Sequence, residues 1–293
     1  MYVGEIKKGE VEPQIRPQIV NETPAIACVD GRNGLGMVVG RYCMELAIKK
    51  AKELGIGWVV ARGSNHYDIA GYYAMMALEE SLVGMSYTNT SPIAFPTRAA
   101  QHVLGTNPIA VAAPSTDPQD PFVLDMATTT VALGKVEIRD REERQCPAGW
   151  GADKAGHPTN DPKDVLGGGG LLYLGGEEET GGYKGYGADY GANIPPWRQG
   201  RGRAANLGQC FVAINPALFC GGFPERMGDL MQQMRSLPPV DPDLPVLVPG
   251  DPEKTTEEAY TKEGIAFHVN LVNALQSLAV ELNVDPLVLK QSP

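Results

Sequence analysis

Residues 25–66 read AIACVDGRNGLGMVVGRYCMELAIKKAKELGIGWVVARGSNH, and this stretch decides the class of fold that we expect. A short apolar run at 25–30 ends in a glycine-rich turn, after which apolar residues recur at helical spacing from 37 to 54. A second apolar run follows at 57–62, after a glycine that ends the helix. The pattern predicts a strand, a helix and a strand, with the polar residues 63–66 at the end of the second strand.

The alternation of apolar runs and helical patterns continues along most of the chain. It predicts a second helix, three short strands after it, a later strand and two helices near the C-terminus. We therefore expect an α/β fold. These elements are expected at 71–81 (helix), 82–88, 108–113 and 122–125 (strands), 209–214 (strand), and 223–236 and 266–282 (helices).

Glycine is concentrated between residues 149 and 202. Such a segment is either a flexible linker or a set of tight turns that bring backbone close to a ligand. The tyrosines and Lys184 inside it favour the second interpretation. Lys184 itself fits either a contact with a phosphate or carboxylate group or a solvated surface position.

The composition argues against several classes of protein. The formal charge of −10 comes without any Lys- or Arg-rich run, so we expect neither a nucleic-acid nor a membrane partner. No stretch approaches the ~18 consecutive apolar residues of a membrane span. The five cysteines are scattered and odd in number, so we expect no disulfide framework and a location in the reducing cytoplasm.

His66 is the first candidate for acid/base chemistry. It follows the second predicted strand beside the small polar residues Ser64 and Asn65, and an unperturbed imidazole titrates at ~6.5, which suits proton transfer at neutral pH. A lone histidine is more often structural, and that alternative stays open. His102 is a second candidate. No group of His, Cys, Asp and Glu has the spacing of metal ligands, so we expect no metal site.

Two further features have both a structural and a functional interpretation. Residues 34–40 carry the glycine pattern of a dinucleotide-binding turn, but no acidic residue ends the next strand, at Ala61 and Arg62, to hold a ribose hydroxyl. A turn with close helix packing explains the same glycines. Asp125 either caps a helix that runs to Lys135 or contacts cofactor or substrate.

Six motifs follow one another along nearly the whole chain: Gly31-Arg32-Asn33-Gly34-Leu35-Gly36, Ser64-Asn65-His66-Tyr67 with Ala70-Gly71-Tyr72-Tyr73, Leu104-Gly105-Thr106-Asn107-Pro108, Leu124-Asp125-Met126-Ala127-Thr128-Thr129, Gly181-Gly182-Tyr183-Lys184-Gly185-Tyr186-Gly187 and Val248-Pro249-Gly250-Asp251-Pro252-Glu253. Together they resemble the type-2 malate/L-lactate dehydrogenase family.

The resemblance implies a mixed-sheet, three-layer α/β fold, not a Rossmann fold, with flanking helical elements and usually a homodimer. We accordingly expect an N-terminal helical remnant at 1–24, a cofactor-binding and catalytic domain at 25–215, and a C-terminal helical part that packs back on the core at 216–293.

The resemblance also implies a reaction, the transfer of a hydride between NAD, or NADP, and a small 2-hydroxy or 2-oxo acid such as malate. It makes His66 the residue that exchanges a proton with the substrate oxygen, and we group Asp125 with it as catalytic. The carboxylates of Asp251 and Glu253 favour NAD, because they would repel the 2′-phosphate of NADP. The residues that the resemblance implies around the dinucleotide are Thr90, Ser91, Asp125, Met126, Ala127, Lys184, Pro249, Gly250 and Asp251.

Two departures from the family pattern bear on the substrate site. In the family a helical segment with a Ser-His-Gly motif and an arginine binds the substrate carboxylate, and we expect this segment to be missing before Met1. We also expect one apolar helix to be missing after Gly187. The alternative function is therefore a catalytically inactive relative that binds the dinucleotide or has a structural role.

Overall fold

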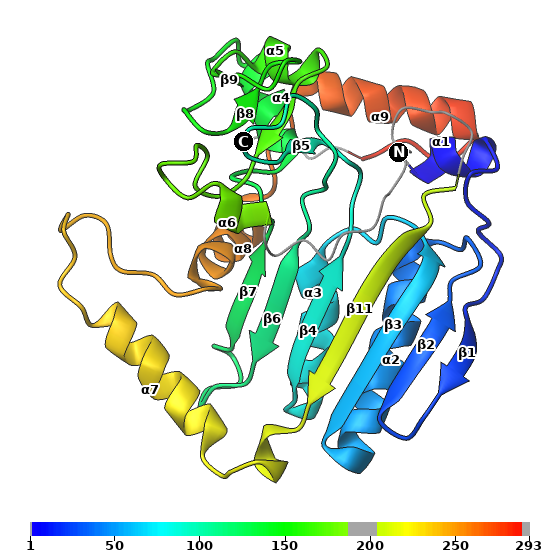
Figure 1. Ribbon diagram of the computed structural model, residues 1–293, viewed down its shortest axis with the longest axis vertical. Helices are drawn as coiled ribbons and strands as arrows, with labels where there is room; N and C mark the ends of the chain where they lie inside the picture. The colour runs from blue at the N-terminus through cyan, green and yellow to red at the C-terminus, as the bar shows by residue number, and fades with distance from the viewer. Residues whose placement is uncertain (1, 187–203, 289–293) are drawn as a thin grey trace. The chain divides into compact units, whose positions relative to one another are not determined.

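The computed structural model describes residues 2–186 and 204–288. The chain divides into two compact units, Met1–Pro249 and Gly250–Pro293. The N-terminal unit contains a seven-stranded sheet, whose strands are labelled in Figure 1, and a four-stranded sheet.

The large sheet is mixed, with one parallel pair among antiparallel neighbours. Its strands follow the order β1-β2-β3-β11-β4-β6-β7, and among these seven only β2 and β3 pair in parallel. The expected α/β class with a mixed sheet is confirmed, and the sheet is not of the Rossmann type, which is mostly parallel. The strands are β1 (Gln18–Glu22), β2 (Ile26–Asp30), β3 (Ile56–Ser64), β4 (Val83–Thr88), β6 (Ile109–Ala113), β7 (Phe122–Met126) and β11 (Leu207–Ile214).

The first strand, helix and strand of the quoted stretch form where the sequence predicts them, as β2, α2 and β3. Val39, Cys43 and Ala47 recur at helical spacing on α2 (Gly36–Leu54) and are fully buried. Gly55 ends the helix in the left-handed conformation, with φ of 89°. Because parallel strands need a crossover connection, α2 carries the chain from β2 back to β3.

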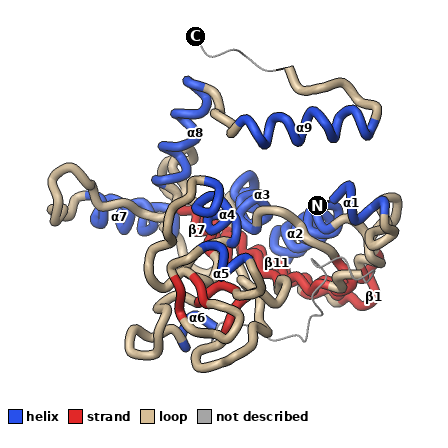
Figure 2. The backbone as a smooth tube through the Cα atoms, turned by 90° about the horizontal axis from the view of Figure 1, so that it is seen from above, coloured by secondary structure: helices blue, strands red, loops and turns tan. Residues whose placement is uncertain are grey.

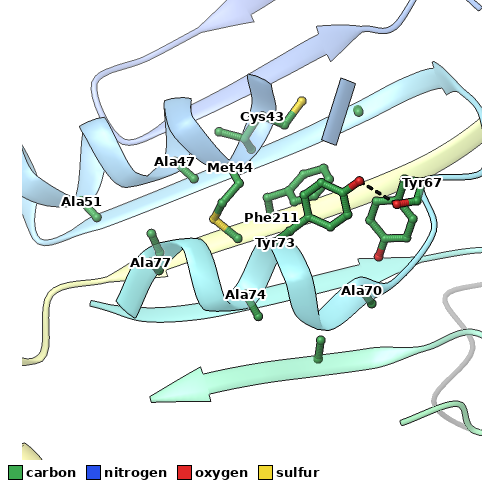
Figure 3. Close-up of a cluster of buried hydrophobic side chains, with 14 of the residues drawn as sticks. Cys43, Met44, Ala47, Ala51, Tyr67, Ala70, Tyr73, Ala74, Ala77 and Phe211 are labelled. Atoms are coloured by element: carbon green, nitrogen blue, oxygen red, sulfur yellow. Dashed lines mark hydrogen bonds between the residues drawn. The ribbon is translucent and has the colours of Figure 1, made fainter. Parts of the chain in front are cut away.

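A second helix lies beside α2 on the same face of the large sheet, as Figures 1 and 2 show. This helix, α3 (Ala70–Met76), continues into the short 3-10 helix η1 (Ala77–Glu80). Tyr73 on α3 packs edge to face against Phe211 on β11, with ring centroids 5.6 Å apart. Figure 3 shows these rings among small alanine side chains of both helices, so the two helices and the sheet share one core.

Two glycines let the helices lie unusually close to the strands. A Cβ atom on Gly57 of β3 would overlap the Ala47 carbonyl of α2, and one on Gly84 of β4 would overlap the Ala74 carbonyl of α3. Helix backbone therefore rests directly on strand backbone at both places, and no other residue type fits there without moving a helix.

The glycine-rich segment forms most of the small sheet and is not a linker. The order of this sheet is β5-β10-β8-β9, and its strands have two or three residues each. Residues 187–203, where we expect a family helix to be missing, lie outside the described part of the chain. The elements of this region are β5 (Ala94–Phe95), α4 (Leu133–Arg141), β8 (Gly151–Ala152), β9 (Pro158–Thr159), α5 (Pro162–Leu166), β10 (Gly170–Leu172) and α6 (Tyr183–Tyr186).

The remaining helices include both of those predicted near the C-terminus. The first is α7 (Phe223–Arg235), and the second is α9 (Val269–Leu282) in the C-terminal unit, where it follows α8 (Asp251–Glu263). None of the helices in the described residues is both long and apolar enough to cross a lipid bilayer. The other short helices are α1 (Tyr2–Lys7) and η2 (Pro216–Leu218).

The three-part domain division stays a prediction. Its first part, residues 1–24, contains the strand β1 in addition to the helix α1, and β1 pairs with β2 at the edge of the large sheet. Residues 216–249, assigned to the third part, belong to the same compact unit as the large sheet.

The contact at Gly57 predicts a large effect from one added methyl group. Gly57→Ala should lower the free energy of unfolding by about 1–3 kcal/mol, because the new Cβ pushes α2 away from β3. The matched control is Gly134→Ala in α4, where nothing lies within 4 Å of the added Cβ, and it should leave stability unchanged or raise it by up to about 1 kcal/mol. Urea unfolding measures both; equal effects at the two positions would contradict this packing.

Candidate functional site

The loop that carries His66 begins at the end of β3 and is held by Asn65. The Asn65 side chain is buried, and its Nδ2 donates to Asn33 Oδ1 at 3.0 Å and to the Gly34 carbonyl at 2.8 Å. Both acceptors lie in the turn between β2 and α2. A polar side chain buried in this way stabilises one loop conformation because its amide would otherwise lose its hydrogen bonds.

His66 is half-buried, and its Nδ1 atom contacts Tyr2 and the backbone of Asp68. The Tyr2 hydroxyl lies 2.7 Å from Nδ1, with the two ring centroids 5.8 Å apart. The backbone N–H of Asp68 donates to the same nitrogen at 3.3 Å. A hydroxyl can donate to an unprotonated ring nitrogen or accept from a protonated one, so Tyr2 can partner both charge states of the imidazole.

The glycine pattern at residues 34–40 packs against the His66 loop. A Cβ on Gly36 would overlap the carbonyl oxygens of Asn65 and His66, and one on Gly40 would lie 2.7 Å from the Tyr73 ring. The interpretation as a turn with close helix packing is therefore confirmed. These glycines allow α2 to begin directly beneath the catalytic candidate.

Tyr67 and Tyr73 form a buried stack behind His66. Their rings are nearly parallel, at 6°, with centroids 4.6 Å apart, and the Tyr73 hydroxyl donates to the Tyr67 carbonyl at 2.6 Å, the dashed line in Figure 3. The Tyr67 hydroxyl lies 3.0 Å from Ser86 Oγ. Burial raises the pKa of both phenols, so both stay protonated at neutral pH and the Tyr73 hydroxyl keeps donating.

Asp125 caps a helix, but not the one expected from the sequence. The helix after it, α4, begins at Leu133 and has no side-chain cap. Asp125 Oδ2 instead accepts the N–H of Gly71 at 2.7 Å, at the first turn of α3, and a Cβ on Gly71 would crowd this oxygen. The capping partner comes from a distant strand because the sheet brings the end of β7 to the start of α3. The cap therefore ties Asp125 to the segment that leaves His66.

Thr90 and Ser91 lie in the loop after β4. Hydrogen bonds join Thr90 to Thr106 and Thr106 to Thr128, and we call these three residues the threonine ridge. Thr106 donates its N–H to Thr90 Oγ1 at 2.7 Å, and Thr128 donates its N–H to the Thr106 carbonyl at 2.9 Å. Ser91 Oγ is buried and has no hydrogen-bond partner among the described residues. Because a buried hydroxyl without a partner is costly, Ser91 is suited to receive a ligand group.

Lys184 lies on α6, which approaches the same ridge. The backbone of Leu174 donates to the Thr128 carbonyl at 2.9 Å, and a Cβ on Gly185 of α6 would lie 2.7 Å from the Tyr173 Cβ. The Tyr173 hydroxyl in turn donates to the Gly105 carbonyl at 2.8 Å. The Lys184 side chain is exposed.

Several of the expected cofactor residues of the N-terminal unit lie close to the threonine ridge. Met126 and Ala127 lie between Asp125 and the ridge residue Thr128, at the end of β7. The Pro249 carbonyl accepts the N–H of Val123 on β7 at 3.2 Å. The two candidates that belong to the C-terminal unit are Gly250 and Asp251.

Other candidate features lie outside this arrangement. His102 Nδ1 lies 2.8 Å from the Pro92 carbonyl, and its ring packs edge to face on Phe95, which is a structural role. Within the described residues, no three His, Cys, Asp or Glu side chains are grouped as metal ligands would be. A cleft of about 870 Å³ opens on the outer side of α2 and α3, but neither His66 nor any cofactor candidate lines it.

Two residues that contact this loop, Tyr2 and Gln209, are not expected from the sequence. Tyr2 falls in the expected N-terminal helical part, and nothing in its neighbourhood indicates a contact with residue 66. Gln209 is polar but falls at the start of a predicted buried strand, and that mismatch was the available signal.

Comparison with known proteins gives consistent matches over nearly the whole chain. The family model described as malate/L-lactate dehydrogenase matches residues 1–276. A malate dehydrogenase of Pyrococcus horikoshii is 38% identical over 98% of this chain and 83% of its own length. An L-sulfolactate dehydrogenase of Methanocaldococcus jannaschii is 36% identical over 97% of this chain and 83% of its own. The crystal structure of malate dehydrogenase from Entamoeba histolytica superposes with a TM-score of 0.89 at 31% identity, over 97% of this chain and 84% of that one.

Proposed function

The chain belongs to the malate/L-lactate dehydrogenase family, and from that premise we propose that it is a dehydrogenase that transfers a hydride between a nicotinamide dinucleotide and a small 2-hydroxy or 2-oxo acid. The observation that carries the proposal is the family match across residues 1–276, which includes the buried and hydrogen-bonded loop of His66. Relatives named for malate and for sulfolactate support a 2-hydroxy acid with a second acidic group, and we propose malate or a close analogue.

We assign proton transfer to His66. Since Tyr2 contacts Nδ1, the exchanged proton belongs on Nε2. In the reductive direction the doubly protonated imidazole donates its Nε2 proton to the carbonyl oxygen of the substrate, and the Nδ1 proton stays on the ring, hydrogen-bonded to the Tyr2 hydroxyl oxygen in place of the 3.3 Å contact with the Asp68 N–H. In the oxidative direction Nε2 accepts the proton of the substrate hydroxyl. A positioned acid/base group of this kind contributes about 10²–10⁴-fold to the rate.

The residues of the threonine ridge and its neighbours fit a bound dinucleotide. The buried, unpartnered Ser91 hydroxyl offers a hydrogen bond, and Gly105 leaves no side chain over Thr90. When bound, the nicotinamide supplies or accepts the hydride. We propose that the dinucleotide is held by Thr90, Ser91, Asp125, Met126, Ala127, Lys184, Pro249, Gly250 and Asp251.

We further propose that the dinucleotide is NAD and that the protein works in the cytoplasm. Asp251 and Glu253 lie in the first turn of α8, and carboxylates beside a ribose would repel the 2′-phosphate of NADP. All five cysteines are free thiols, which suits a reducing compartment.

We propose that the active form is a homodimer, and that the open face of the large sheet forms the interface. Two rows of apolar side chains cross six strands on the face opposite α2 and α3, and Ile26, Trp58 and Val60 remain 53%, 47% and 39% exposed. Burial raises the pKa of the Cys210 thiol to about 11, so the thiol in this face is uncharged at neutral pH. The cross-strand rows are Cys28, Val60, Cys210, Tyr87, Ile109 and Met126, and Ile26, Trp58, Val212, Met85, Val111 and Leu124.

A second copy of this chain is the occupant that matches such a face. Apolar rows exclude water when they pack against another apolar surface, and a two-fold axis presents the identical face to itself. Two sheets packed in this way interdigitate their inner side chains at a spacing of about 10 Å.

The role of His66 is tested by turnover of malate with NAD, followed by the absorbance of NADH. His66→Ala should lower kcat by roughly 10²-fold or more and leave NADH binding, measured by fluorescence, within about twofold. The control is His157→Ala, whose side chain is 81% exposed and pairs with Asp153, and its kcat should equal that of the wild type. Undiminished turnover in His66→Ala would remove the assignment, and wild-type protein that binds NADH without turnover would support the inactive alternative.

The interface is tested by light scattering of the purified chain. The wild type should have the mass of a dimer, and Trp58→Glu should have the mass of a monomer, because it places a charge within the apolar rows. The control is Val103→Glu, a residue 48% exposed outside the large sheet, which should stay dimeric. A monomeric wild type, or a dimeric Trp58→Glu variant, would refute this interface.

A further inference from the structure

We propose that Gln209 is a positioning residue that sets the orientation of His66 through the peptide bond between residues 65 and 66. The proposal rests on the role assigned to His66 above. Gln209 lies on β11 with 3% of its surface exposed, and neither the resemblance nor the relatives assign it a role.

Gln209 uses both ends of its amide. Its Nε2 donates to the Asn65 carbonyl oxygen at 3.0 Å, and its Oε1 accepts the Ser64 hydroxyl at 2.8 Å. The Asn65 carbonyl belongs to the peptide group whose nitrogen is that of His66. The hydrogen bond from Gln209 therefore fixes the plane of the 65–66 peptide, and with it the direction in which the His66 side chain leaves the backbone.

An irregularity in the pairing of β3 with β11 brings these groups together. Leu207 pairs with Ser64 and Gln209 with Ala61, so between these pairs one residue of β11, Gly208, lies opposite two of β3, Arg62 and Gly63. Gly63 lies within this bulge in the left-handed conformation, with φ of 61°. A bulge reverses the alternation of side chains after it, so Ser64 turns to the buried face where Gln209 lies.

The same peptide also lies against the start of α2. Gly36 lies so close to the Asn65 and His66 carbonyl oxygens that no Cβ fits there. The backbone of α2 at Gly36 therefore leaves this peptide no room to move toward the helix, and the side-chain amide of Gln209 fixes the direction of its carbonyl. A catalytic group displaced by about 1 Å can lose on the order of 10²-fold in rate, so this direction matters for proton transfer.

The site needs a donor and an acceptor in one side chain, which makes Gln209→Glu an informative variant. The ionised carboxylate still accepts from Ser64 but cannot donate to the Asn65 carbonyl and repels it. The protonated acid can do both. Because burial raises the pKa of a carboxyl group, protonation should be reached at moderately acidic pH.

The experiment compares kcat of Gln209→Glu and wild type between pH 5.5 and pH 8.5. We expect kcat of the variant to be lower by about tenfold or more at the alkaline end, with the ratio to wild type recovering at least about threefold toward the acidic end. The Kd for NADH should stay within about twofold. Ser64→Ala, which keeps the bond from Gln209 to Asn65, should show a smaller loss and no such pH dependence.

Gln209→Met covers the case in which the glutamate variant does not fold. It keeps the length of the side chain without a donor, and we expect the same loss of kcat at every pH with unchanged NADH affinity. A kcat within about twofold of wild type in the folded variants would overturn the proposal, as would a pH-independent loss in Gln209→Glu accompanied by an equal loss of NADH affinity. If His66→Ala, measured in parallel, keeps full turnover, the assignment of proton transfer to His66 fails and takes the premise of this inference with it; if His66→Ala loses turnover while the folded Gln209 variants keep it, this inference alone fails.

Discussion

The contact between helix α2 and the strand and loop beside it is the constraint on which the rest of the structure depends. Gly57 brings β3 against the backbone of α2, and Gly36 brings the start of α2 against the carbonyls of Asn65 and His66. A side chain at Gly57 or Gly36 would push α2 away from β3 and from the His66 loop and leave a gap that the core side chains could not fill. The most buried side chains, including Val39 and Tyr73, pack around this contact, and the loop that carries His66 takes its place from it.

The proposed proton donor is thus supported from several directions by groups that are far apart in sequence. Tyr2 contacts the ring itself, Gln209 holds the preceding peptide, and Asp125 caps the helix that follows. Preorganisation of this kind removes the need to order the site during each reaction cycle. Dinucleotide chemistry needs little more from the protein than such a positioned proton carrier and a shaped pocket.

Periodicity alone predicted α2 and six strands of the large sheet, β2, β3, β4, β6, β7 and β11, because their apolar residues repeat over several positions; it did not predict the edge strand β1. It did not predict the small sheet, whose strands of two or three residues are too short to show a period. The reaction, and the role of His66, came from the resemblance of six motifs. Asp125 was expected to cap its own following helix, and Tyr2 and Gln209 were missed, because each acts on a residue more than fifty positions away. Contacts at such separation are set by the packing of the sheet, which no local pattern contains.

The central claim is that His66 exchanges a proton with the substrate oxygen. The most direct test is a crystal structure of the chain with NADH and malate, two reduced partners that cannot react with each other. We expect His66 Nε2 to lie about 2.6–3.2 Å from the 2-hydroxyl oxygen of malate, with Tyr2 on the opposite ring nitrogen. A structure in which another side chain binds that hydroxyl, and the His66 ring points away from it, would contradict the account.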